Sequence, residues 1–210
     1  MMPFVRSALA LLLVAGFACS ATAAVPSAAN STFPRCLVTC PFGDIHFVVV
    51  VRDLANNPVA GALVDLEFAD CPGAYLCPQR PNYGYTVDPV TRRVRMIADA
   101  SGSADFPLHV GGVCGTGGVR LFADGVFFAS YALASPDQSG DGVVISIFGT
   151  DFTTFSAKLG TTDPTADLDC SGTVDAADTF IFEQHVAHAC DGIVLPTRQR
   201  NWGELKLHYR

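Results

Sequence analysis

The stretch from position 167 to position 178, D-L-D-C-S-G-T-V-D-A-A-D, has the residue types and the spacing of a calcium loop. Oxygen-bearing side chains stand at loop positions 1, 3, 5, 9 and 12, and Thr173 at position 7 offers its backbone carbonyl. A glycine, Gly172, stands at position 6, where the backbone must turn sharply. Because Ca²⁺ is a hard cation that prefers oxygen ligands, the pattern predicts a calcium site. The predicted ligands are Asp167, Asp169, Ser171, Thr173 (carbonyl), Asp175 and Asp178. The alternative is a solvated, Asp-rich turn that holds no ion.

A second stretch, residues 137–151, repeats this pattern 30 positions earlier in the chain. The repeat breaks at position 12, which would be Phe148, a side chain that cannot bind a cation. If Ile145-Ser146-Ile147 is a local insertion, Asp151 takes the role of the last ligand. The predicted ligands of this first loop are Asp137, Ser139, Asp141, Val143 (carbonyl) and Asp151. The alternative is that the first loop binds calcium weakly or not at all.

Each loop is followed by apolar residues at helical spacing. They are Phe152, Phe155 and Leu159 after the first loop, with Gly160 as a natural end, and Phe182, Val186 and Ala189 after the second. Two short helices can bury such stripes only against each other or against the rest of the protein. We therefore expect calcium binding to be coupled to folding.

The preceding residues, 44–134, have the patterns of short β-strands. Phe47 to Val51 is a continuous apolar run, which predicts a strand buried on both faces. Ala62 to Phe68 alternates, with Val64, Leu66 and Phe68 on one face. Asp124-Gly125 predicts a two-residue hairpin turn between two further strands. Six or seven short strands without a helical period predict a mainly β fold, a β-sandwich of about 90 residues. Pro107 predicts that its own strand lies at a sheet edge.

Two parts of the chain resemble known families. The segments V-V-V-R-D-L-A-N-N-P-V-A-G-A-L-V-D-L-E-F (49–68) and A-D-A-S-G-S-A-D-F (98–106) resemble the immunoglobulin-like repeats of bacterial surface proteins. This resemblance implies an immunoglobulin-like β-sandwich. The paired loops with their helices, residues 136–190, resemble a type I dockerin module. That resemblance implies calcium in both loops and docking onto a cohesin domain of a scaffold protein, often in complexes that degrade polysaccharides. Many dockerins carry a Ser-Thr pair at loop positions 10 and 11, where this chain has Ala176-Ala177 and Gly149-Thr150.

The N-terminal residues indicate export. Residues 1–23 have the basic start, the short apolar run and the small residues Ala21-Thr22-Ala23 of a cleaved signal peptide. We expect residues 24–43 to be a flexible mature N-terminus and residues 191–210 to be a tail. No second segment is apolar and long enough to anchor the protein in a membrane. The net charge of −7 gives no electrostatic case for binding nucleic acid.

The cysteines are expected to form disulfides, because an exported protein meets an oxidising compartment. Of the eight cysteines, Cys19 lies in the signal peptide. The other seven are Cys36, Cys40, Cys71, Cys77, Cys114, Cys170 and Cys190. An odd number leaves one thiol free or paired with another molecule. Cys71 with Cys77 is the most economical local bridge. Cys170 and Cys190 are separated by a predicted helix of about 18 Å, which is too long to bridge, so that Cys190 must pair elsewhere or the helix must end early. Zinc binding by Cys36 and Cys40 is the competing interpretation.

Little in the sequence points to catalysis. It lacks a nucleophile elbow, a zinc-protease helix motif and a phosphate loop. Glu67 and Glu183 are formal candidates for glycoside hydrolysis. His185 and His188 could form a metal-binding face, but we interpret them as a solvated surface. Three hypotheses remain: a non-catalytic, exported assembly or docking module, a structural cell-surface protein that calcium only stabilises, and a small carbohydrate-active protein.

Overall fold

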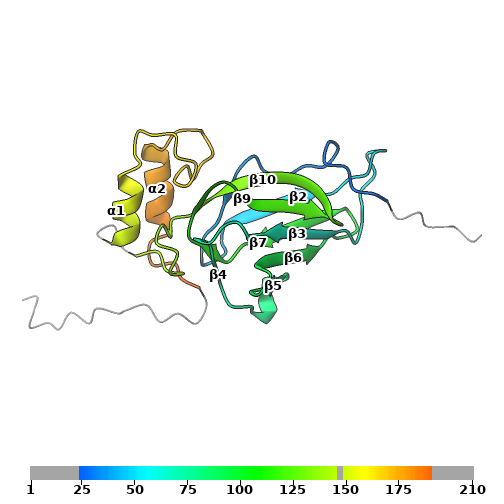
Figure 1. The fold of residues 1–210 in the computed structure, drawn as a ribbon, viewed down its shortest axis with the longest axis horizontal. Coiled ribbons are helices and arrows are strands. Elements are labelled where there is room, and N and C mark those ends of the chain that lie inside the picture. Colours follow the sequence, from blue (N-terminus) through cyan, green and yellow to red (C-terminus); the bar gives the residue numbers. More distant parts are fainter. Residues whose placement is uncertain (1–23, 146–148, 191–210) are drawn as a thin grey trace, which may run out of the picture.

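The protein is mainly β, with two helices that lie side by side at one end (Figure 1). The computed structural model describes residues 24–145 and 149–190, so the predicted signal peptide, the predicted tail and most of the predicted insertion in the first loop lie outside the described residues. Within them, neither helix has the length and apolar character needed to cross a membrane. The strands are β1 Leu37–Val38, β2 His46–Val50, β3 Leu63–Glu67, β4 Tyr75–Leu76, β5 Thr86–Asp88, β6 Arg93–Ile97, β7 Ser103–Pro107, β8 Val110–Gly111, β9 Cys114–Ala123 and β10 Val126–Ala134. The helices are the single 3₁₀ turn Pro81–Tyr83, α1 Thr150–Ser156 and α2 Ala176–Gln184.

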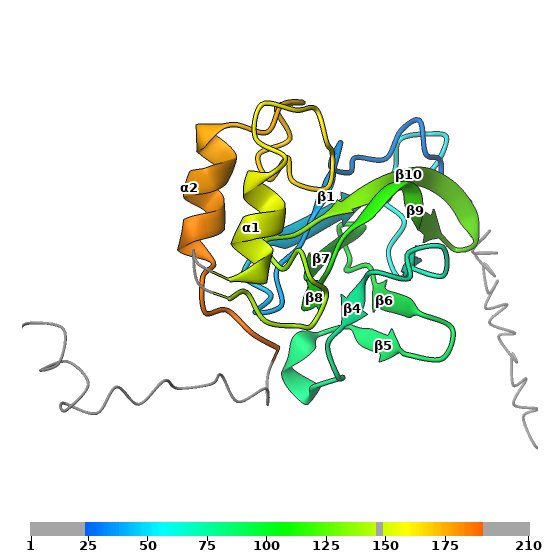
Figure 2. The same cartoon turned by 60° about the vertical axis from the view of Figure 1, so that its left-hand side comes forward.

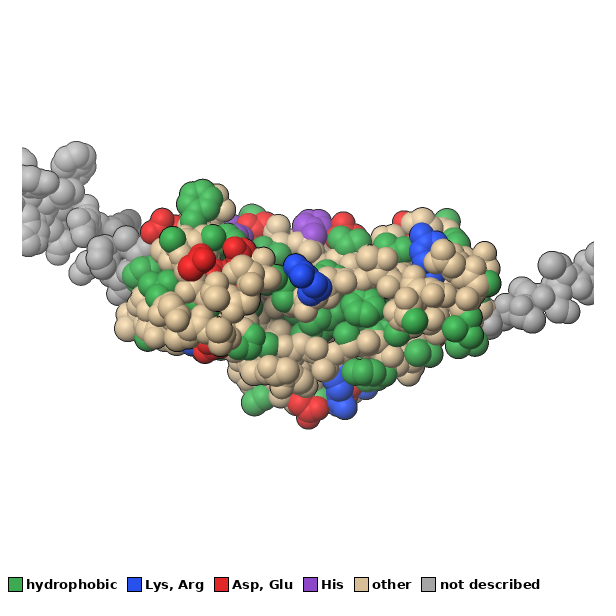
Figure 3. All heavy atoms as spheres, turned by 90° about the horizontal axis from the view of Figure 1, so that it is seen from above, with side chains coloured by type: hydrophobic (Ala, Val, Ile, Leu, Met, Phe, Trp, Pro, Cys, Tyr) green, Lys and Arg blue, Asp and Glu red, His purple; other side chains and the backbone are tan. Residues whose placement is uncertain are grey.

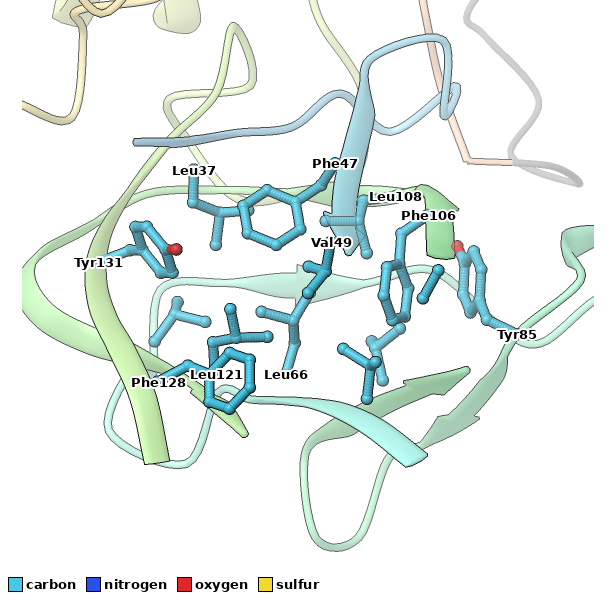
Figure 4. Packing of buried hydrophobic residues seen from close by; sticks show 14 of the residues in the cluster. Leu37, Phe47, Val49, Leu66, Tyr85, Phe106, Leu108, Leu121, Phe128 and Tyr131 are labelled. Atoms are coloured by element: carbon cyan, nitrogen blue, oxygen red, sulfur yellow. The ribbon is translucent and has the colours of Figure 1, made fainter. Parts of the chain in front are cut away.

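The strands form one large sheet and two small ones (Figure 2). The six-stranded sheet has the order β1-β10-β9-β3-β6-β5, in which only the β1–β10 pair is parallel. β2 pairs with β7, and β4 pairs with β8. The apolar face of the β2–β7 pair packs on the six-stranded sheet, as the edge-to-face contact between Phe47 and Tyr131 shows. Figure 4 shows the side chains that fill the space between these layers.

Local sequence signals predicted several strands correctly. Val64 and Leu66 of β3 are fully buried, as their alternation predicted. Asp124 and Gly125 both have positive φ, as a two-residue turn between β9 and β10 requires. The prediction for β2 was wrong, because this strand alternates: Phe47 and Val49 are buried, whereas Val48 is 40% exposed. The β2–β7 sheet packs on the six-stranded sheet through one face, so β2 needs apolar side chains on that face only.

The prediction that residues 24–43 are flexible was also wrong. Thr32 exchanges two backbone hydrogen bonds with Val50, and Ser27 donates to the Arg52 carbonyl at 2.7 Å. Further along, β1 joins the edge of the six-stranded sheet next to β10. These partners lie far away in the sequence, and composition alone does not indicate such pairing.

Three disulfides tie the chain together: Cys36–Cys170, Cys71–Cys114 and Cys77–Cys190. The prediction of a local Cys71–Cys77 bridge was therefore wrong. The Cys36–Cys170 bridge also excludes the competing interpretation, zinc binding by Cys36 with Cys40. Cys190 pairs elsewhere, with Cys77, and α2 also ends early, at Gln184. Cys40 is the free thiol among the described residues, and it is fully buried. Two of the bridges join the helical end of the protein to its β-rich part.

The turn between β6 and β7 should make stability depend on pH. Oδ1 of Asp99 accepts hydrogen bonds from the hydroxyl of Ser101 and from the backbone N–H groups of Ser101 and Ser103. These bonds, the hydroxyl first, hold the pKa of Asp99 below its ordinary value of 3.8. Because the pKa of Asp99 is lower in the folded protein than in the unfolded chain, its ionised carboxylate stabilises the fold fully at pH values above 3.8. This stabilisation is lost as the pH falls through the lowered pKa of the folded protein.

We therefore expect Asp99→Asn to be less stable than the native protein near neutral pH, with a difference that shrinks towards about pH 3. Free energies of unfolding in urea at both pH values test this. Asp105→Asn, an exposed change in β7, is the control. A difference that stays constant between the two pH values would contradict the assignment.

Candidate calcium loops

The second loop brings three of its predicted ligands together. Oxygen atoms of Asp167, Asp169 and Asp178 lie within 4.8 Å of one another. The hydroxyl of Ser171 donates to the carbonyl of Thr173 at 3.0 Å, so both of these predicted ligands lie on the same side of the turn. Asp175 has a different position, because its side chain caps α2 by accepting from the N–H of Ala177 at 2.7 Å.

The sequence explains why α2 begins where the loop ends. Asp175 is the residue before the helix, and its carboxylate accepts a backbone N–H of the first turn. Asp178 reaches back to the N–H of Asp175 at 2.8 Å, which completes a capping box. The cap therefore fixes Asp178 with its carboxylate turned into the loop.

The first loop repeats several hydrogen bonds of the second. Gly142 donates to Oδ2 of Asp137 at 2.9 Å, as Gly172 does to Oδ2 of Asp167 at 2.8 Å. Asp151 accepts from the N–H of residues 139 and 145, and Asp178 accepts from the N–H of the equivalent residues 169 and 175. Asp151 thus occupies the place of Asp178, although the chain between residue 145 and Asp151 is three residues longer than its counterpart.

The two helices also follow this repeat, and the segment after each helix contacts the loop that precedes the other helix. Phe155 of α1 and Phe182 of α2, both fully buried, stack with ring centroids 5.0 Å apart. Val174 exchanges backbone hydrogen bonds with the segment after α1, residues 160–161, and Val144 does so with the segment after α2, residues 187–188. Each loop is therefore held by the end of the other helix. The two halves share one small core, to which Cys40 and Ala134 also contribute.

Burial and charge make a cation favourable in these loops. Asp137, Asp151 and Asp178 are 0% exposed. None of the ion pairs between described residues includes a carboxylate of either loop. Burial raises the pKa of Asp137 to about 6, against the hydrogen bonds from Gly142 and Gly140, and the carboxylates of Asp151 and Asp141 add to the rise. A bound divalent cation would compensate this buried negative charge. Acidic side chains lie on the surface of this end of the molecule (Figure 3).

The two loops are not equivalent as ligand sets. Within residues 24–145 and 149–190, the carboxylates of Asp137, Asp141 and Asp151 do not come as close together as those of the second loop. Asp141 is exposed and accepts from the N–H of Val143 at 3.0 Å. Val143 itself forms an isolated bridge with Ala189. The second loop is therefore the better prepared of the two sites.

The structure also gathers a cluster that the sequence did not reveal. His185 is buried rather than solvated, so that its interpretation as a surface residue was wrong. His185 and His188 both face Asp44, at 3.5 and 3.3 Å, and Nδ1 of His188 lies 3.5 Å from the thiol sulfur of Cys40. Cys40 and Asp44 are more than 140 positions away in the chain, and no local signal pointed to them.

The two formal catalytic candidates belong to different elements. Glu67, in β3, forms ion pairs with Arg93 at 3.0 Å and with Arg120 at 3.4 Å. Glu183 is an exposed residue of α2. The carboxylate of Glu67 is thus engaged in a cross-strand charge network on the six-stranded sheet.

No protein-family model, curated protein or solved structure matches this chain. What the protein does must therefore be inferred from its own residues.

The role of Asp151 can be tested separately from the second loop. In Asp151→Asn, the amide nitrogen faces the N–H of Ser139 or of Ile145, so one buried hydrogen bond is lost and the negative charge disappears. We expect the free energy of unfolding to fall by about 1–3 kcal/mol and the first loop to lose its calcium. Calorimetric titration should then show one fewer calcium ion per chain, with the affinity of the second loop retained. Unchanged stoichiometry and affinity would exclude Asp151 as a ligand.

Proposed function

We propose that this chain is an exported, non-catalytic calcium-binding protein. In this proposal, a helical module with two calcium loops, residues 136–190, is joined to an immunoglobulin-like β-sandwich and serves as an assembly or docking module. The single observation that carries it is that Asp151 and Asp178 close their loops with equivalent pairs of hydrogen bonds. An Asp-rich turn without an ion would leave the buried negative charge of both carboxylates without a compensating cation.

Export is supported by the pattern of residues 1–23 and by the three disulfides, which persist in oxidising compartments. The Cys36–Cys170 bridge enters the second loop at its fourth position. A bridge at this place would hold the loop in the conformation that binds its ion, and it would stabilise the fold of the module outside the cell.

A partner would meet an apolar surface at the start of α2. Ala176 and Ala177 are exposed, and Phe180, three positions after Ala177, is 62% exposed. Residues at this spacing lie on one face of a helix. Alanine lacks the hydroxyl groups with which a Ser-Thr pair would bind a cohesin, so we expect recognition through apolar contact. The runner-up function is a structural cell-surface protein in which the same loops bind calcium but recruit no partner.

Calcium binding is tested by calorimetric titration of chelator-treated protein whose disulfides are intact. The proposal predicts saturable binding that Asp178→Asn weakens and that Asp105→Asn, a change remote from the loops, leaves unaltered. Absence of calcium binding would refute the proposed function. Immobilised protein exposed to candidate scaffold domains, with and without calcium, then separates the two candidates. Calcium-dependent binding that Phe180→Asp abolishes supports docking, and no binding to any of them favours the structural function.

A further inference from the structure

We propose that Cys40, Asp44, His185 and His188 form a binding site for a divalent transition-metal ion, and that the ion is zinc. The site would join the segment before β2 to the segment after α2, outside the calcium loops. One ligand atom from each of the four residues lies within 4.8 Å of all the others. Thiolate, imidazole and carboxylate are all ligands that zinc takes in proteins, and four of them complete its tetrahedral coordination.

Three of the six distances between the ligand atoms are those of tetrahedral coordination. Zinc bonds of about 2.0–2.3 Å place a nitrogen and an oxygen ligand about 3.4 Å apart, and a sulfur and a nitrogen about 3.6 Å apart. Oδ2 of Asp44 lies 3.3 Å from Nδ1 of His188 and 3.5 Å from Nε2 of His185. Sγ of Cys40 lies 3.5 Å from Nδ1 of His188.

Both histidine rings are oriented for binding. Nδ1 of His185 donates to the carbonyl of Ile181 at 2.7 Å, so Nε2, which faces Asp44, is the ring nitrogen left to bind an ion. A metal-binding histidine typically donates its other N–H in this way, which fixes its tautomer. The ring of His188 packs against Phe42, with centroids 4.7 Å apart, and this contact holds its Nδ1 towards Cys40 and Asp44.

A tight turn brings Cys40 and Asp44 to the same place. Gly43 donates its N–H to the carbonyl of Cys40 at 2.9 Å and has φ +77°. A side chain at Gly43 would also clash with the ring of His109. The turn therefore needs glycine, and it places the carboxylate that follows beside the thiol that precedes it.

Two other interpretations fit less well. In a catalytic cysteine, histidine and aspartate triad, the acid contacts the ring nitrogen that does not face the thiol. Here Cys40 and Asp44 approach the same nitrogen of His188, and Cys40 is fully buried. A plain ion pair between Asp44 and the histidines does not involve the thiol, although its sulfur lies 3.5 Å from Nδ1 of His188. Among the described residues Cys40 is the cysteine outside a disulfide, so it is free to bind an ion as a thiolate, with its proton released to solvent.

The ligand chemistry separates this site from the calcium loops. Thiolate and imidazole ligands favour zinc and similar metals, whereas the loops offer only oxygen atoms, which favour calcium. The proposed site thus does not depend on calcium binding. Its ion would hold the end of α2 on the β-rich part, close in the sequence to the Cys77–Cys190 bridge.

Cobalt(II) is the probe, because its spectrum reports both geometry and thiolate binding. Chelator-treated full chain with intact disulfides is titrated with Co²⁺ in excess Ca²⁺, which keeps the loops filled. We expect one Co²⁺ per chain to give the near-ultraviolet thiolate absorption and the intense visible bands of a tetrahedral complex, and Zn²⁺ to displace it. Cys40→Ser should remove the thiolate band. His185→Ala should weaken binding at least about 100-fold, since loss of a group that only orients a metal ligand costs about 10–100-fold. His46→Ala, an exposed histidine of β2, is the matched control.

Near-ultraviolet circular dichroism shows that each variant is folded, and the more exposed His188→Gln replaces any variant that is not. Absence of the thiolate band in the native protein, or its persistence in Cys40→Ser, would overturn the proposal. The contacts of Asp44 with the two histidines would then be interpreted as a plain ion pair. If the protein binds cobalt through Cys40 but does not bind calcium, the proposed function is refuted and this site is supported.

Discussion

Replacing Asp178 by alanine is expected to lower the free energy of unfolding of the calcium-loaded protein by roughly 3–5 kcal/mol, because a buried charged partner is removed from the groups it binds. Asp178 is 0% exposed and accepts from the backbone N–H groups of Leu168, Asp169 and Asp175 at 2.6, 3.1 and 2.8 Å. Alanine leaves these donors without their acceptor. It also removes one of the three clustered carboxylates of the second loop.

Unfolding in urea, with calcium and with chelator, separates these two contributions. In chelator, only the hydrogen-bond loss should remain, so the gap between native and Asp178→Ala protein should narrow. Asp178→Asn keeps the size of the side chain, so its free energy of unfolding should lie between those of the native protein and Asp178→Ala. Asp105→Asn is the control for a surface charge. A gap of the same size with and without calcium would show that Asp178 is a cap and not a ligand.

Breaking the Cys36–Cys170 bridge by serine substitutions at both positions is expected to have the second large effect on stability. The bridge closes 134 residues of chain, and the entropy of so long a loop corresponds to up to about 5 kcal/mol of stability, less where the other bridges already restrict the unfolded chain. Cys170 also has φ +63° inside the second loop, a conformation that non-glycine residues rarely adopt. We therefore expect the double variant to lose calcium affinity together with stability.

The Cys71–Cys114 bridge supplies the comparison, because it closes 43 residues wholly within the β-rich part. Its removal should lower the midpoint of thermal unfolding and leave the calcium affinity of the folded protein unchanged. Calorimetric titration of both double variants below their melting range measures this difference. Equal calcium affinity in the two variants would mean that the Cys36–Cys170 bridge does not shape the loop.

The sequence predicted features that depend on neighbouring residues. The hairpin at Asp124-Gly125 follows from the positive φ that this dipeptide tolerates, and β3 follows from the alternation of Val64 and Leu66. The mainly β fold is confirmed for the same reason. The repeat of the two loops was visible in spacing alone, and the structure adds that Asp151 takes the place of Asp178 through its hydrogen bonds.

Features that depend on distant residues escaped prediction. Which cysteines pair is decided by the packing of the helical end on the β-rich part, and nearness in sequence misleads, as Cys71 and Cys77 show. The pairing of β1 with β10 depends on a strand almost 100 positions away. His185 and His188 looked like a solvated face because their partners, Cys40 and Asp44, lie at the other end of the described chain.

Thermal unfolding of the full chain at increasing calcium concentration tests the central claim most directly. An ion that binds the folded state alone raises the midpoint in proportion to the logarithm of its concentration once the site is saturated. We predict such a rise, its reversal by chelator, and its reduction in Asp178→Asn. A midpoint that does not change between chelator and excess calcium would contradict the claim that residues 137–151 and 167–178 are calcium loops.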